Sequence, residues 1–158
     1  MKKHRFKQTA DWISRKPFAI SNGLSELENH LFSVSLEGGS INHLTQESGW
    51  HSVSLSPLKN IMIDSWSNVR MPNTSVLKNN KGEFIKILSS SDISEYEDVN
   101  WTYPKFVTVN TSDGMNLNAK ITLPWNFDKS KKYPIIINIY GLAGSQKVRN
   151  QWVSRGFL

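Results

Sequence analysis

A near-continuous apolar run towards the C-terminal end of the chain, Ile135-Ile136-Ile137-Asn138-Ile139, places the strongest constraint on the fold. A polar stretch, Lys131-Lys132-Tyr133-Pro134, precedes the run, and a glycine-bearing loop, Tyr140–Gln146, follows it. Apolar residues without alternation suit a strand that is covered on both faces, as in a parallel sheet flanked by helices. Because the sequence contains a single run of this kind, we predict only the first part of such a sheet.

The part of the chain from about His30 onward has the period-two pattern of antiparallel strands. Turn residues at short spacing divide this pattern into three hairpins. The paired strands are predicted at Leu31–Leu36 with Ile41–Thr45, His51–Ser56 with Ile61–Trp66, and Thr74–Lys78 with Glu83–Leu88. Six strands in so short a stretch are typical of propeller blades or of a meander sheet.

A shift in composition towards Ser, Asp and Glu between Ser89 and Asn100 marks the predicted domain boundary. Beyond it, Pro104–Thr111 and Met115–Leu123 flank Ser112-Asp113-Gly114, which is a strong hairpin signal. We therefore expect four parts: an unassigned basic head (1–18), the end of a propeller (19–88), a linker (89–104) and the start of a mixed sheet (105–158).

Composition excludes several classes of protein. A hydrophobic content of 38% with six Trp argues against disorder, because such a chain has apolar surface to bury. The absence of Cys excludes disulfides and thiolate metal sites but is compatible with every compartment. We expect no membrane span, because no run approaches the roughly 18 apolar residues required. Localisation stays unknown; the sequence lacks the apolar part of an export signal, so a chain expressed as written is expected in the cytoplasm.

The net charge of +6 raises the question of nucleic-acid binding. Most of the excess lies in residues 1–16, which carry six Lys and Arg against one Asp. A solvated tail explains such a basic head, so nucleic acid is not expected as a partner. Association with nucleic acid through this head stays open as a minor alternative.

Five short motifs occur in a fixed order between about residues 20 and 148. They are Thr45–Pro57 with its Gly49-Trp50-His51 triplet, Asp64–Val69, Met71-Pro72, Thr111–Asn118, and Asn126–Pro134 continuing into Tyr140-Gly141-x-x-Gly144-Ser145-Gln146. The series resembles the dipeptidyl peptidase IV-like serine peptidases of the prolyl oligopeptidase family. The resemblance implies a mainly β fold: the last blades of a β-propeller followed by the first strands of an α/β-hydrolase sheet, incomplete.

The resemblance also implies proteolysis by a Ser–His–Asp triad, with an acyl-enzyme formed after a penultimate Pro or Ala of a peptide substrate. In that family a tyrosine hydroxyl stabilises the oxyanion, and Tyr140 stands at the matching position. The triad itself is absent, since no Gly-x-Ser-x-Gly nucleophile turn occurs in this sequence. We therefore expect a fragment of a serine-type dipeptidyl peptidase that is inactive alone. Full-length relatives are often exported or membrane-anchored.

Other residues have simpler explanations than chemistry. His30, His43 and His51 match no metal-ligand spacing and no carboxylate clusters with them in the sequence, so we expect structural or surface histidines, no metal and no cofactor. Ser145 lies in the wrong loop for a nucleophile. Tyr140 has its own alternative as a packing residue.

Tryptophans keep a second class of function open. Scattered Trp in a β-rich chain usually packs blades, but it also serves carbohydrate- or peptide-binding surfaces. A complete small β-rich binding module is therefore the alternative to a peptidase fragment. The residues concerned are Trp50, Trp66, Trp101, Trp125 and Trp152.

Isolated blades leave strand edges open, and an uncovered Ile135 strand exposes apolar surface. We therefore expect poor solubility, through aggregation at the open edges, unless a complementing chain covers them.

Overall fold

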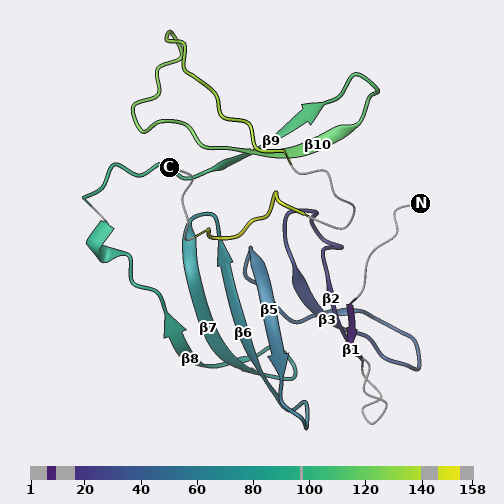
Figure 1. Cartoon of the computed structure of the whole chain (residues 1–158). Helices are drawn as coiled ribbons and strands as arrows, with labels where there is room; N and C mark the ends of the chain where they lie inside the picture. Colours follow the sequence, from purple (N-terminus) through teal and green to yellow (C-terminus); the bar gives the residue numbers. More distant parts are fainter. Residues whose placement is uncertain (1–6, 10–16, 97, 140–145, 154–158) are drawn as a thin grey trace. The chain divides into compact units, whose positions relative to one another are not determined.

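The computed structural model describes residues 7–9, 17–96, 98–139 and 146–153. The described residues form β-strands and one short 3-10 helix (Figure 1). Their contacts divide the chain into two units, the first containing the residues up to Asp92 together with those from Arg149 onward, and the second containing Ile93–Val148. The domain limits expected from the sequence stay a prediction. None of the described helical segments has the length and apolar character to cross a membrane.

The larger sheet of the first unit is a four-stranded antiparallel meander (Figure 1). Its strands follow one another in chain order: β5 (Trp50–Leu55), β6 (Ile61–Asn68), β7 (Met71–Asn79) and β8 (Phe84–Ser90). Short turns join them, as expected for a propeller blade. The second and third predicted hairpins are therefore confirmed, and the pairing of β6 with β7 combines them into one sheet.

A second antiparallel sheet of four strands lies in the same unit, in the order β1-β2-β3-β4. The hairpin of β3 (His30–Ser33) and β4 (Asn42–His43) confirms the first predicted pair, although both strands are shorter than predicted. The sequence pattern did not reveal β1 (Lys7–Thr9) and β2 (Phe18–Ser21). β1 is too short and polar to show alternation, so its strand conformation depends on pairing with β2.

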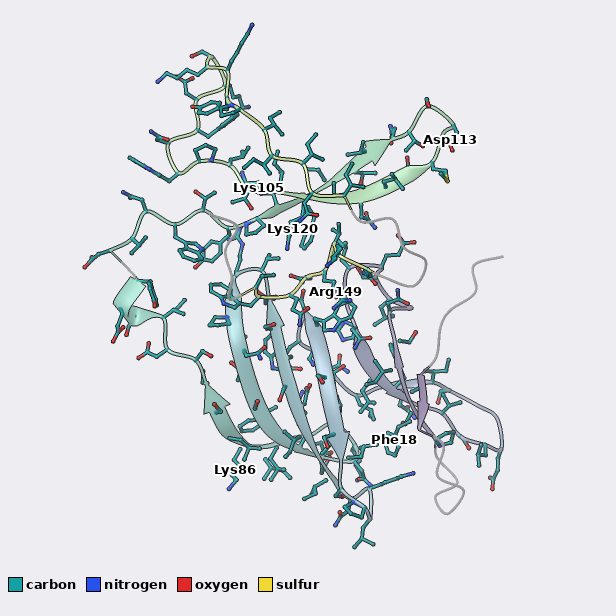
Figure 2. The ribbon with its side chains drawn as sticks, in the orientation of Figure 1. Phe18, Lys86, Lys105, Asp113, Lys120 and Arg149 are labelled. Atoms are coloured by element: carbon teal, nitrogen blue, oxygen red, sulfur yellow. The ribbon has the colours of Figure 1, made fainter. Side chains whose placement is uncertain are left out.

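Both sheets contribute side chains to one small apolar core. Phe18 of β2, Leu31 of β3, Leu44 and Met62 of β6 are each at most 6% exposed, and Ile20, Val53 and Leu55 pack against them. Figure 2 shows Phe18 among the side chains of the first unit. On β6 the alternation is clear, since Met62 and Asp64 are buried while Ile61 and Ile63 are not. The face of the blade that contributes to the core therefore also carries Asp64.

The second unit contains the predicted hairpin around Ser112-Asp113-Gly114. Its strands β9 (Lys105–Asn110) and β10 (Asn116–Ile121) pair antiparallel, with Asn110 opposite Asn116 at the turn and Lys105 opposite Ile121 at the far end. Gly114 has a φ of 84°, the left-handed conformation that a tight hairpin turn requires. The 3-10 helix η1 (Ser94–Tyr96) lies in the predicted linker.

The buried strand expected at Ile135–Ile139 is not formed, so this prediction is wrong for the described structure. The segment pairs with no strand in the described part of the chain, and its four isoleucines are 75–90% exposed. A β-strand requires a neighbouring strand to which its backbone hydrogen-bonds. An apolar run without such a neighbour has no backbone hydrogen-bond ladder, and no packed elements cover its side chains. Among the described residues, no α/β-hydrolase sheet is therefore formed.

Candidate functional site

The two residues that the sequence analysis considered for a role in catalysis lie outside the described part of the chain. Tyr140, the candidate oxyanion donor, and Ser145, the rejected nucleophile, both belong to residues 140–145. The role of Tyr140 stays a prediction. The polar groups that the structure does bring together lie in the first unit, on the buried face of the blade.

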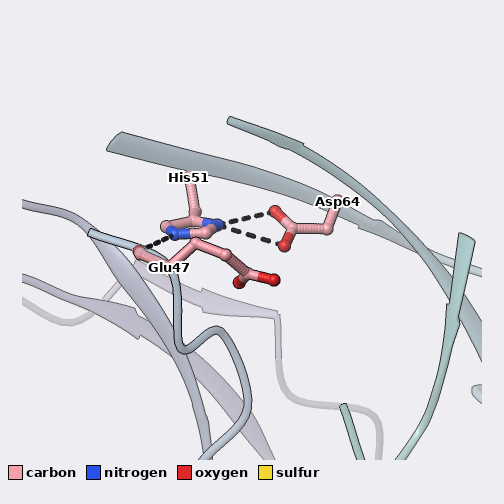
Figure 3. Close-up of side chains that lie close together, drawn as sticks. All are labelled: Glu47, His51 and Asp64. Carbon is pink, nitrogen blue, oxygen red and sulfur yellow. Dashed lines mark hydrogen bonds and ion pairs between the residues drawn. The ribbon is translucent and has the colours of Figure 1, made fainter. Parts of the chain in front are cut away.

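A cluster of four charged side chains occupies that face: Glu47, His51 on β5, Asp64 on β6 and Lys78 on β7. Figure 3 shows the first three of these side chains. Strand register brings the side chains of His51, Asp64 and Lys78 together. Asp64 lies directly opposite Val53 on β5 and Val76 on β7. His51 and Lys78 are then its diagonal neighbours on the same face, which long side chains can reach.

Short contacts connect the four members of this charge cluster. His51 Nδ1 lies 2.9 and 3.1 Å from the two carboxylate oxygens of Asp64. Lys78 Nζ donates to Asp64 Oδ2 at 3.1 Å and to the two Glu47 oxygens at 2.8 and 3.1 Å. His51 Nε2 donates to the backbone carbonyl of Glu47 at 2.7 Å. The last contact ties the loop before β5 to the blade.

Electrostatic balance makes this burial tolerable. Asp64 is 0% exposed, His51 1% and Lys78 2%, and charged groups are buried only when paired and hydrogen-bonded. An acceptor faces each ring nitrogen of His51, so both nitrogens have a hydrogen-bonding partner. Burial acts to raise the pKa of Glu47, but the hydrogen bond from Lys78, a backbone hydrogen bond and the charge of Lys78 together outweigh it, so the pKa lies below its ordinary value.

The pairing of His51 with Asp64 resembles the base and orienting acid of a catalytic triad, but it cannot act as one. A general base needs a free nitrogen within reach of the substrate proton. His51 Nε2 is already bonded to the Glu47 carbonyl, and the side chains of His51 and Asp64 are both fully buried. The pair therefore stabilises the blade and takes no part in proton transfer to a substrate.

Metal binding is the other chemistry that these residue types support. The ligand atoms of Glu47, His51 and Asp64 lie within 4.8 Å of one another. Lys78 Nζ, however, bonds to both carboxylates and takes the place a metal cation would need. The donor set fits an internal ammonium rather than a metal ion.

The sequence showed no carboxylate clustered with the histidines, but the fold brings one to His51. Asp64 and His51 are 13 residues apart in the chain, and only the pairing of β5 with β6 makes them neighbours. The predicted β5–β6 hairpin, with its register, was the one signal that could have revealed the contact.

The three histidines also meet one another. The His30 ring centroid lies 4.6 Å from that of His43 and 5.0 Å from that of His51, and Trp66 stacks on His51 at 5.5 Å. His30 Nε2 bonds to Glu28 at 3.1 Å. Burial, with the neighbouring His30 and His51, lowers the pKa of His43. His30 and His51 are thus packed side chains with partners of their own, as the structural explanation predicts.

A four-stranded antiparallel blade, packed against a second sheet and held by a buried charge cluster, defines this chain as part of a β-propeller protein. Residues 11–73 match the family model of the dipeptidyl peptidase IV (DPP IV) N-terminal region. The crystal structure of Porphyromonas gingivalis dipeptidyl peptidase 4 has the same fold, with a TM-score of 0.86 at 20% identity over 97% of this chain and 22% of that one.

Curated relatives carry related names. The probable dipeptidyl-aminopeptidase B of Ajellomyces dermatitidis is 30% identical over 140 residues, covering 85% of this chain and 15% of the relative. Dipeptidyl peptidase 4 of Arthroderma otae is 27% identical over 152 residues, covering 93% of this chain and 20% of the relative. This chain is thus dipeptidyl peptidase IV-like. It spans 15–20% of the length of these two relatives.

Proposed function

We propose that this chain supplies the propeller end and the oxyanion tyrosine of a serine-type dipeptidyl peptidase. One observation carries the proposal: similarity to proteins named dipeptidyl peptidases runs along 85–93% of the chain in two of its relatives. The blade beginning with Gly49-Trp50-His51 also folds as the resemblance implies. The substrate is then a peptide, cleaved after a penultimate Pro or Ala.

In the proposed mechanism, Tyr140 donates its hydroxyl hydrogen to the oxyanion of the tetrahedral intermediate. The attacking serine, its histidine base and the orienting aspartate come from residues that this sequence does not contain. Other oxyanion donors contribute on the order of 10²–10³ in kcat, so a similar effect is expected for Tyr140. The 158 residues alone are inactive, because a donor without a nucleophile has no intermediate to stabilise.

Two measurements test the proposal. The 158-residue chain should not hydrolyse a chromogenic Xaa-Pro substrate, and hydrolysis that a serine-directed phosphonate abolishes would contradict its inactivity. In a protein that includes the nucleophile, Tyr140→Phe should lower kcat by about 10²-fold or more with little change in KM. An unchanged kcat would assign Tyr140 to packing instead.

The alternative, a tryptophan-based binding module, has less support. Arg149 covers the ring of Trp50 at 4.5 Å, and Trp66 stacks on the buried His51. These two rings are therefore engaged within the first unit, whereas Trp125 is 65% exposed.

A further inference from the structure

A short segment far along the chain returns to the first unit and bonds to it at several separate places. Residues 149–152 follow the whole of the second unit, yet they cluster with the first. Asn150 N donates to the carbonyl of Leu27 at 2.7 Å. Trp152 N donates to Ser67 Oγ at 3.2 Å, and Arg149 lies over the ring of Trp50. Figure 2 labels Arg149 on this segment.

Asn150 uses every hydrogen-bonding group of its side chain in this contact. Its Nδ2 donates to Glu28 Oε1 at 2.8 Å and to Ser48 Oγ at 3.1 Å. Its Oδ1 accepts the backbone N–H of Val69 at 3.1 Å. One side chain thus joins three segments that lie 81–122 residues away from it in the chain.

Glu28 is the charged partner in this arrangement. One of its oxygens accepts from both Asn150 and Ser48, and the other faces His30 Nε2 at 3.1 Å. Burial acts to raise the pKa of Glu28, but the hydrogen bonds from Ser48, Asn150 and His30 outweigh it and hold the pKa below its ordinary value. Hydrogen bonds to an ionised acceptor are about twice as strong as neutral ones.

We propose that residues 149–152 form a strap that fastens this part of the chain to the first unit, with Asn150 as its positioning residue and Glu28 as its anchor. Asparagine suits the position because two donors and one acceptor are needed at once, which Asp and Leu do not offer.

The strap does not rest on the proposed function. The test therefore uses no peptidase activity.

Hydrogen exchange of the 158-residue chain reports the strap directly, through the amides of Val69, Asn150 and Trp152. In Asn150→Asp, both donors are lost and a second carboxylate faces Glu28. We expect the three amides to exchange about 10- to 100-fold faster, while the amides of the β6–β7 ladder change less than about twofold. The matched control is Asn126→Asp, at an exposed loop position, which should change none of them.

A double variant in which the amide and the carboxylate change places distinguishes loss of the Asn150–Glu28 hydrogen bond from a general loss of packing. Glu28→Gln alone should also speed exchange of the three amides. Combined with Asn150→Asp, it places an amide donor opposite a carboxylate again, so protection should largely return. The proposal is overturned by unchanged exchange in Asn150→Asp, by an equal rise throughout β6 and β7, or by a double variant no better protected than Asn150→Asp.

Discussion

At the residue scale, the stability of the blade depends on fully buried polar and charged side chains that bond to one another. Asp64 accepts hydrogen bonds from Lys78 and faces His51, and its side chain is 0% exposed. Removing one partner of a buried ion pair leaves the remaining charges uncompensated, which is more costly than the pair itself is stabilising. Substitutions within the charge cluster are therefore expected to be costly.

Asp64→Asn should destabilise the chain by about 3–5 kcal/mol, because Lys78 and His51 lose their shared carboxylate. The measurement is the free energy of unfolding in urea. Asp98→Asn, at an exposed position after η1, should change it by less than about 0.5 kcal/mol. Equal effects of the two substitutions would show that the cluster contributes little.

Lys78→Ala should convert the charge cluster into a metal-binding one. Without the ammonium, the ligand atoms of Glu47, His51 and Asp64 remain within 4.8 Å of one another and need a cation. We expect Zn²⁺ to raise the Tm of Lys78→Ala but not that of the unsubstituted chain, since a ligand that binds only the folded state stabilises it. A rise in both would show that Lys78 does not exclude the metal.

The dependence of stability on pH follows from Glu28 and Glu47. Both have a folded-state pKa below the ordinary 4.5, so the unfolded chain binds more protons near that pH. Their contribution is present above pH 4.5 and is lost as pH falls through the lower folded values. The lowered pKa of His43 acts in the same direction below 6.5.

Glu47→Gln should therefore be less stable than the unsubstituted chain at pH 7, and the difference should shrink as pH falls below 4.5. Urea unfolding at a series of pH values measures it. Glu95→Gln, an exposed position in η1, provides the control and should leave the whole profile unchanged. A gap between Glu47→Gln and the unsubstituted chain that is constant with pH would contradict the assignment.

At the scale of elements, the hairpins were predictable and two further strands were not. Alternation with turn residues located β3 to β10, because those signals are local in sequence. β1 and β2 lack such a pattern. They become strands because β3 offers an edge to β2, and β2 in turn offers one to β1.

Gly49 fixes the entry of the chain into β5. Its φ is 149°, and an added Cβ would lie 2.3 Å from the backbone oxygen of Ser67. Gly49→Ala should therefore cost at least about 2 kcal/mol more than Gly38→Ala, where φ is also positive but nothing lies within 4 Å. Urea unfolding of the two variants gives the difference, and equal losses would show that the close approach is unimportant.

At the scale of the whole molecule, apolar surface without a partner is expected to govern behaviour in solution. Ile135, Ile136, Ile137 and Ile139 are 75–90% exposed, and β8 adds a further exposed row. Contiguous patches of this kind promote association.

The purified 158-residue chain should self-associate, and Ile137→Lys should reduce the association. Sedimentation velocity measures it. Leu58→Lys is the control, since Leu58 is 85% exposed but lies outside this run, in a turn of the first unit, so it should have little effect. A monodisperse monomer in the unsubstituted chain would contradict the expectation.

The sequence by itself determined the hairpins, the propeller class and the likeness to dipeptidyl peptidases, because turns, alternation and ordered motifs are properties of neighbouring residues. It also indicated a strand at Ile135–Ile139, which failed because apolar character does not supply a pairing partner. Only the tertiary structure decided the environment of the charges and the strap at Asn150. Those contacts join residues that lie 13–122 positions apart in the chain. Strand register and the path of the chain bring these residues together, and no local sequence pattern encodes either.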